Sequence, residues 1–279
     1  MWRAPFPTST VSEVLQACLN QTAIPALRER VAAATLEIEA ATRTFEAAGR
    51  AVSFYLLKSE DFQVAGVTKE EMESMYDRMS RAGTPARSFY DQIRNSRKLC
   101  PMCNQRIVET VDHYLPKKKF PALAVSPPNL LPACSDCNKI KLASVPSDIQ
   151  QQTLNPYYDD VESAPWLKAT IRQSVPAVVR FYVDPPPSWS EDLAERAKFH
   201  FRTFRLGRLY SIYAGEEASL IRAGLKRDYK RGGSVAVRQT LAEAAQTRLD
   251  ARINSWQTAA YFAWRDDDWF CNSGFDLIG

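Results

Sequence analysis

Four cysteines in two closely spaced pairs stand near the middle of this 279-residue chain. The pairs are Cys100-Pro-Met-Cys103 and Cys134-Ser-Asp-Cys137, and thirty residues, 104 to 133, separate them. Two such pairs supply four thiolates, the usual tetrahedral ligand set of a structural zinc ion. Because four thiolates leave zinc no open coordination position, we expect this zinc to hold the surrounding chain in place and to take no part in a reaction.

The residues around the cysteines offer chemistry that a closed zinc site lacks. Asp112-His113 lies between the pairs, Asn129 precedes the second pair, and Asn138 directly follows the last cysteine. Imidazole titrates near neutral pH, which makes His113 the candidate general base. Carboxylate and amide oxygens suit a hard divalent cation such as Mg²⁺ or Mn²⁺, so Asp112 and Asn138 are its candidate ligands.

This arrangement resembles the HNH nucleases, a ββα-metal family. Their pattern is an Asp-His pair on a first strand, an Asn after a loop and a third ligand on the following helix. The segment from Asn129 to Lys141 reads Asn-Leu-Leu-Pro-Ala-Cys-Ser-Asp-Cys-Asn-Lys-Ile-Lys and keeps the spacing of the zinc-bearing members. It departs from many of them in carrying Asn138 where His is common. The resemblance covers about residues 98–145.

The resemblance implies an endonuclease that hydrolyses phosphodiester bonds of DNA. It implies that His113 is the catalytic base and that Asp112 and Asn138 hold one catalytic Mg²⁺ or Mn²⁺. It also implies that Asn129 orients the loop and the catalytic histidine. An ordinary turn residue after two prolines is the alternative interpretation of Asn129.

Basic residues cluster at the motif. Their neutralisation of phosphates gives affinity for nucleic acid that is independent of sequence and sensitive to salt. A lysine run is also typical of a solvated face, and the neighbouring motif favours DNA contact here. The candidate contacts are Lys117, Lys118, Lys119, Lys139 and Lys141.

Composition sets the remaining limits. The net charge of +4 is too small to indicate a nucleic-acid partner by itself. No apolar run approaches the length of a membrane span, and paired Cys-x-x-Cys motifs fit zinc in a reducing cytoplasm better than disulfides. We therefore expect a cytoplasmic protein without a membrane partner, in which Cys18 and Cys271 are buried apolar residues.

The predicted fold is mainly α, with a small ββα-metal core and helices before and after it. Residues 1–97 are expected to form an N-terminal helical region, residues 98–150 the zinc-bound nuclease core, and residues 151–279 a mostly helical C-terminal region with a short β-hairpin. A first short helix over 11–18 and a long one from 26 to 57 precede a capped helix that starts at Thr68. The apolar stripe of the long helix must pack inside the chain, on a second copy or on another subunit.

In the C-terminal region the pattern predicts a hairpin of 169–173 with 176–183. A helix capped near Ser188 is expected to run past Tyr213, and Gly232-Gly233 divides it from a last helix over 235–264. His200 lies between aromatic residues and is interpreted as a packed residue, and Asn155 as a polar turn residue near the site.

The C-terminal half resembles the tail of bacterial HNH proteins encoded in anti-phage defence operons of the Septu and retron-linked types. This resemblance implies an ABC/SMC-like ATPase as a partner. Two alternatives remain open. One is a non-catalytic, zinc-organised module for nucleic-acid binding or assembly. The other is a homing-type nuclease of a mobile element.

Overall fold

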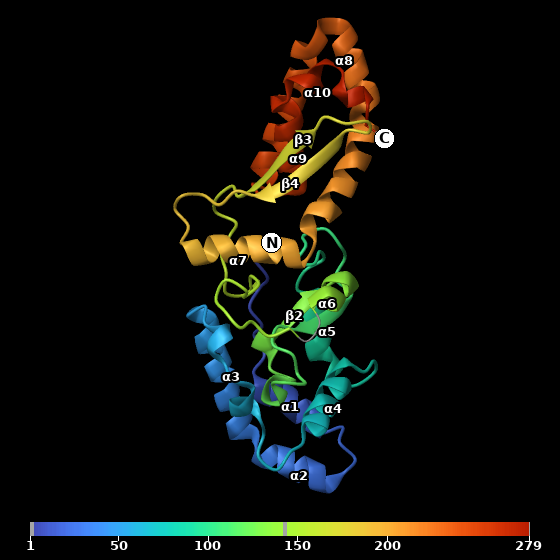
Figure 1. Ribbon diagram of the computed structural model, residues 1–279. Helices are drawn as coiled ribbons and strands as arrows, with labels where there is room; N and C mark the ends of the chain where they lie inside the picture. Colours follow the sequence, from blue (N-terminus) through green and yellow to red (C-terminus); the bar gives the residue numbers. More distant parts are fainter. Residues whose placement is uncertain (1–2, 142–143, 279) are drawn as a thin grey trace. The chain divides into compact units, whose positions relative to one another are not determined.

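The computed structural model describes residues 3–141 and 144–278, and it divides into two compact units, residues 1–160 and 161–279 (Figure 1). The two regions expected at 1–97 and 98–150 therefore lie in one unit, which continues to Asp160. The chain is mainly helical, as predicted, with two small two-stranded sheets. Within the described ranges no helix is both long and apolar enough to cross a membrane.

Five helices form the N-terminal part of the first unit. Thr10 and Thr68 begin the first and fourth of them with capping boxes, in which the threonine hydroxyl accepts from the backbone N–H of Glu13 or Glu71. These boxes confirm the predicted helix starts. The five helices are α1 (Val11–Leu19), α2 (Pro25–Ala33), α3 (Thr35–Arg50), α4 (Lys69–Ser80) and α5 (Arg87–Asn95).

The single long helix expected from 26 to 57 is wrong. The chain breaks at Ala34, whose ψ of 1° is not helical, and α3 ends at Arg50. There Val52 takes a left-handed φ of 56°, its N–H donates to Gly49 O at 3.2 Å, and Ser53 N donates to Ala48 O at 2.8 Å. These two bonds form a Schellman motif, which ends a helix whatever the propensity of the residues beyond it.

Gly49 gives α3 its close contact with the turn after Asn155. A Cβ built on Gly49 would lie 2.6 Å from the Tyr158 ring, which packs edge-on against Phe45 and Phe54. Gly49→Ala should therefore destabilise the protein by about 1–3 kcal/mol through overpacking. Gly215→Ala is the matched control, because its Cβ meets nothing within 4 Å, and it should stabilise the helix by about 0.5–1 kcal/mol. Urea denaturation checks both values, and equal shifts of the same sign would refute the packing argument.

A small hairpin and a short helix complete the first unit. Strands β1 (Thr110–His113) and β2 (Leu130–Ala133) pair antiparallel, with Asp112 opposite Leu131 and His113 opposite Leu130. Helix α6 (Ser135–Lys141) follows β2 directly and contacts β1. The order strand, strand, helix is the one predicted for residues 98–150. Short 3-10 turns line the chain around them: η1 (Phe54–Leu56), η2 (Ser59–Phe62), η3 (Pro121–Leu123) and η4 (Pro127–Asn129).

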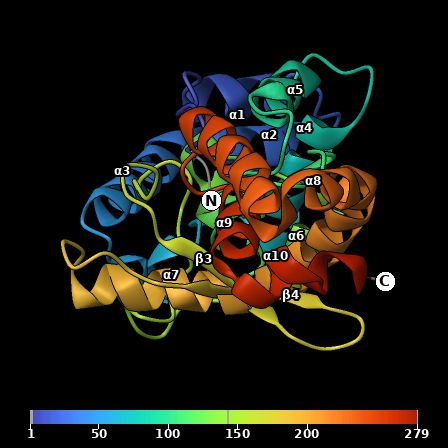
Figure 2. The ribbon, with the colours of Figure 1, turned by 90° about the horizontal axis from the view of Figure 1, so that it is seen from above.

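The second unit packs a two-stranded sheet on helices. Strand β3 lies against α9 and strand β4 against α8 (Figures 1 and 2). The hairpin confirms the strands expected near 169–173 and 176–183. The elements are β3 (Leu167–Arg172), β4 (Val178–Val183), α7 (Glu191–Thr203), α8 (Leu206–Ala251), α9 (Trp256–Asp266), α10 (Asp268–Asn272) and η5 (Gly274–Asp276).

The helices of this unit break in more places than predicted. Ser190, not Ser188, caps α7, and Arg205 with a left-handed φ of 52° separates α7 from α8. Gly232 and Gly233 leave helical geometry inside α8, as the glycine pair predicted. The last helix is not continuous to Trp264, because α8 ends at Ala251 and Ser255 caps α9.

Candidate metal centre and catalytic site

The four predicted cysteines meet at one point of the first unit. Their sulfur atoms all lie within 4.8 Å of one another, and all four residues are buried. The Sγ atoms of Cys103 and Cys134, which come from different pairs, are 3.9 Å apart. Four sulfurs at this spacing can hold a metal ion such as zinc.

Local backbone structure brings each pair to the cluster. The first pair sits in a tight turn, in which Cys100 N donates to Arg106 O at 2.8 Å and Asn104 N donates to Cys100 O at 2.7 Å. Asn104 closes this turn with a left-handed φ of 55°, a conformation that Asn tolerates better than most residues. The second pair lies at the start of α6, where Cys137 N donates to Cys134 Sγ at 3.4 Å.

The thiols of the cluster compete for protons. Hydrogen bonding among the thiols raises the pKa of Cys100 and Cys137, and it lowers the pKa of Cys103 and Cys134. Four thiolates at this distance repel one another. A divalent cation supplies the positive charge that lets all four ionise, so the donor set fits a metal better than it fits four neutral thiols.

Helix α6 crosses β1 and contacts its side chains at two points. Asn138 Nδ2 donates to Thr110 Oγ1 at 3.2 Å, and Lys141 Nζ lies 3.7 Å from Asp112 Oδ2. Two residues along a strand point to the same face, and three residues along a helix lie on one side. The predicted cation ligands Asp112 and Asn138 therefore both lie at this strand–helix contact, with the amide oxygen of Asn138 left to accept.

Asp112 is a largely buried carboxylate, 12% exposed, whose Oδ2 is paired with the Lys141 ammonium at 3.7 Å. No hydrogen bond reaches its Oδ2, and burial raises its pKa while Lys141 opposes the rise. Lys141 is itself only 6% exposed; burial lowers its pKa, and its Nζ also donates to the carbonyl of His113. A hard cation is the ligand that a desolvated carboxylate of this kind fits.

His113 is held at the end of β1 with a defined tautomer. Its Nε2 lies 2.8 Å from Ala124 O, and since a carbonyl oxygen only accepts, Nε2 carries the proton and Nδ1 the lone pair. The centres of the His113 and Tyr76 rings are 4.4 Å apart, and the two rings pack edge to face. Burial lowers the pKa of His113 to about 3. The burial keeps the imidazole neutral, as a general base must be, but it also makes His113 a weaker base than the free side chain, which titrates near neutral pH.

Asn129 fixes the loop that follows His113. The residue is fully buried, and its Oδ1 accepts from Leu115 N at 2.7 Å. Its Nδ2 donates to Leu115 O at 3.0 Å and to Leu123 O at 3.3 Å, one residue before the carbonyl that holds His113. These bonds make Asn129 a positioning residue for the loop and rule out an ordinary exposed turn.

Replacing Asn129 with aspartate tests this positioning. The carboxylate still accepts from Leu115 N, but it then faces two carbonyl oxygens that have lost their donor. We expect a loss of about 2–4 kcal/mol in the free energy of unfolding, measured in urea with zinc present. Asn95→Asp, at the exposed end of α5, is the matched control and should change stability by less than about 0.5 kcal/mol. Similar losses for the two variants would contradict the assignment.

The five predicted lysine contacts fall into different environments. Lys118, Lys119 and Lys139 are exposed. Lys117 is half-buried, with its Nζ 3.4 Å from an oxygen of Asp77 and 4.4 Å from the centre of the Tyr76 ring. Lys141 is buried beside Asp112, so it is placed to act at the strand–helix contact rather than on an outer surface.

Sequence reasoning missed Tyr76. Its hydroxyl donates to Val111 O at 2.7 Å, so α4 supports β1 next to His113. Nothing in the spacing around Tyr76 signals this contact, because it joins segments 35 residues apart.

The structure also shows the surroundings of Asn155 and His200. Asn155 is fully buried and its Oδ1 accepts from Tyr157 N, as in a polar turn, while Tyr157 in turn donates to Leu130 O opposite His113. His200 is buried in the second unit against Phe204, which agrees with a packed residue.

Comparison with known proteins shows a similarity to a phage protein. Protein ea31 of Escherichia phage lambda is 29% identical to this chain over 231 residues, which cover 78% of the chain and 78% of ea31. Because the first unit has 160 residues, the similarity extends into both units. No protein-family model matches the chain. No solved structure matches it.

Proposed function

We propose that this protein is a metal-dependent endonuclease of the HNH type that hydrolyses phosphodiester bonds in DNA. The main support is the placement of three groups on β1 and on the helix that contacts it. These are an imidazole with a fixed tautomer at the end of β1, a largely buried carboxylate one residue before it whose Oδ2 accepts no hydrogen bond, and an amide of α6 that contacts Thr110 at the start of β1. The strand and the helix that carry these groups lie in the same unit as the four-cysteine cluster, and α6 contains Cys137 of that cluster.

Each residue has a distinct part in this proposal. His113 Nδ1 takes the proton of the attacking water as the water oxygen bonds to phosphorus and the bond to the 3′-oxygen breaks. The oxygens of Asp112 and Asn138 hold a hard cation, and Asn129 keeps the loop in place. A bound Mg²⁺ or Mn²⁺ supplies positive charge for the phosphate and the leaving oxygen. The zinc ion contributes only structure.

The exposed lysines at the motif supply the phosphate contacts of the proposed substrate. Lys118 and Lys119 lie in the segment that follows β1, and Lys139 lies on α6 between Asn138 and Lys141. Such contacts position the backbone without reading sequence. The proposed substrate class is therefore DNA in general, with no base preference assigned to these residues.

Incubation of the purified, zinc-loaded protein with supercoiled plasmid tests the proposal. Nicked or linear DNA should form with Mg²⁺ or Mn²⁺ and not with EDTA. Binding to DNA without any cutting would instead favour the second candidate, a non-catalytic zinc-organised binding or assembly module, which the four-cysteine cluster alone also supports.

The defence role and the ABC/SMC-like ATPase partner remain proposals. They are carried by the resemblance of the C-terminal half described above. Co-purification with the product of a neighbouring ATPase gene tests them, and the assembly state of the isolated chain is read in the same experiment.

A further inference from the structure

The second unit presents a positively charged face on its β-hairpin. In the β3–β4 register Lys168 lies opposite Tyr182, Thr170 opposite Arg180, and Arg172 opposite Val178. Residues two apart share a face of a strand, so these six side chains all point to one side. On the other side Val179 and Phe181 are buried against the helices. The hairpin is therefore apolar toward the unit and cationic toward solvent.

The cations of this face have no acidic partners. Arg172 and Arg180 are exposed, and neither they nor Lys168 makes an ion pair within the part of the chain that the structure describes. Tyr182, on the same face, is 43% exposed. An uncompensated set of cations beside an exposed aromatic ring favours a polyanionic partner.

The start of α8 extends the charge along β4. Ser211 Oγ donates to Val179 O at 2.6 Å, and a Cβ on Gly207 would lie 3.6 Å from Phe181 O. Arg208 stands between these two contacts on the helix, is exposed, and has no ion pair within the described residues. The helix therefore places a further free arginine beside the strand that carries Arg180.

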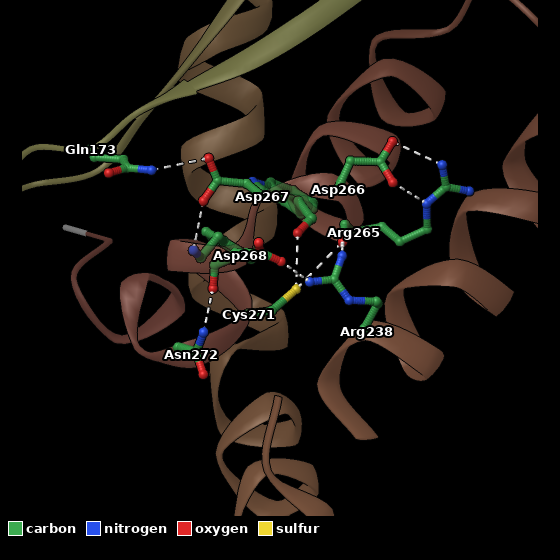
Figure 3. A network of polar contacts seen from close by, with 10 residues as sticks. Gln173, Arg238, Arg265, Asp266, Asp267, Asp268, Cys271 and Asn272 are labelled. Carbon is green, nitrogen blue, oxygen red and sulfur yellow. Dashed lines mark hydrogen bonds and ion pairs between the residues drawn. The ribbon is translucent and has the colours of Figure 1, made fainter. Parts of the chain in front are cut away.

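The acidic run next to the hairpin is neutralised only in part by local partners. Asp266 pairs with Arg265 at 2.6 Å, and Asp268 pairs with Arg238 (Figure 3). Asp267 accepts from Phe270 N at 2.7 Å and from Gln173 Nε2, just beyond β3, at 3.4 Å. Two of the three carboxylates are thus paired with arginines, whereas Asp267 accepts from neutral donors, keeps its charge and fastens the hairpin tip to the helices.

We propose that the outer face of the β3–β4 hairpin binds in the major groove of double-stranded DNA. A two-stranded ribbon fits the groove, which is about 12 Å wide. Six-residue strands extend about 20 Å. Arg172, Arg180 and Arg208 then contact the phosphates along the groove. The choice of DNA as the polyanion rests on the proposed nuclease function. The positive charge of the face is an observation independent of that function.

Fluorescence anisotropy with a labelled 30-base-pair duplex in EDTA tests the proposal without any cutting. The test variant is Arg172→Gln/Arg180→Gln. The control is Arg227→Gln/Lys230→Gln, which removes the same charge from two exposed cations of α8 that have no ion pairs among the described residues. Circular dichroism melts confirm that both are folded.

The test variant should bind the duplex at least about tenfold more weakly than the control at 0.15 M salt. Its slope of log K against log salt should be smaller by about 2, since each lost phosphate contact removes about 0.9. Equal binding by the two variants would overturn the proposal. So would an equal loss of binding to a single strand of the same length, because a single strand has no groove.

These outcomes are separate from those of the nuclease proposal. Metal-dependent cutting with equal duplex binding by both variants would refute the hairpin site alone. Selective loss of binding in a protein that never cuts DNA would refute the nuclease alone.

Discussion

Replacing His113 with alanine is expected to reduce cutting of plasmid DNA by at least about 100-fold at every Mg²⁺ and Mn²⁺ concentration. General-base catalysis contributes about 10²–10⁴-fold, and no other histidine of the chain lies in the first unit. The ring contacts Ala124 and Tyr76 and is not a member of the four-cysteine cluster, so one zinc per chain should remain. The measurements are initial rates of nicking and zinc content.

Loss of the imidazole also removes packing, and a matched variant separates the two effects. His113→Ala gives up the bond to Ala124 and the contact with Tyr76, which should cost about 2 kcal/mol of stability. Val111→Ala, two residues earlier on β1 and equally buried, should cost a similar amount and still cut DNA. If both variants lose activity together, or if His113→Ala keeps it, the catalytic role of His113 is wrong.

Cys137→Ser should unfold the first unit and release its zinc. Zinc binding to small structural sites is worth about 10–16 kcal/mol, which exceeds the net stability of most domains. Cys137 is a buried residue of α6, the helix that also carries Asn138 and Lys141. We therefore expect no bound metal by elemental analysis, loss of the first unit's melting transition and complete loss of cutting.

Cys18→Ser provides the control for a general effect of losing a thiol. Cys18 is fully buried in α1 and is separate from the cluster, and burial raises its pKa to about 12, so it is an unreactive packing residue. This variant should lose about 1–2 kcal/mol and keep one zinc and full activity. A Cys137→Ser protein that melts like wild type would show that the cluster does not support the fold.

The four-cysteine cluster could be predicted from the sequence because the spacing of its two pairs indicates a shared metal. Two Cys-x-x-Cys pairs can share a metal whenever the chain between them returns to its start, and the 30 residues here form that return as β1, a loop and β2. The expected roles of Asp112, Asn129 and Asn138 come from the resemblance to the HNH nucleases and stay predictions.

Contacts between distant segments could not be predicted in this way. Lys141 was expected among the surface cations, yet the crossing of α6 over β1 turns it toward Asp112. Tyr76 of α4 donates to a carbonyl of β1, and no periodic pattern in the sequence indicates this contact. Both depend on the angle between packed elements, which the sequence specifies only through the whole core.

The predicted helix ends are wrong where one residue adopts a left-handed backbone conformation although the helix propensity of the neighbouring residues would let the helix continue. The residues after Arg50 continue an acceptable helical composition, but Val52 adopts a left-handed φ and ends α3. Arg205 separates α7 from α8 in the same way. Neither residue is a glycine, so the usual sequence signal for such a stop was missing, whereas Gly232-Gly233 gave it correctly.

Anomalous diffraction at the zinc and manganese edges, from crystals of the protein soaked in Mn²⁺, tests the central claim most directly. We predict zinc bound by Cys100, Cys103, Cys134 and Cys137 with sulfur distances of about 2.3 Å. We also predict manganese on the side-chain oxygens of Asp112 and Asn138, with the Lys141 ammonium moved away from Asp112. Manganese that binds elsewhere, or a cysteine cluster without zinc, would contradict the account.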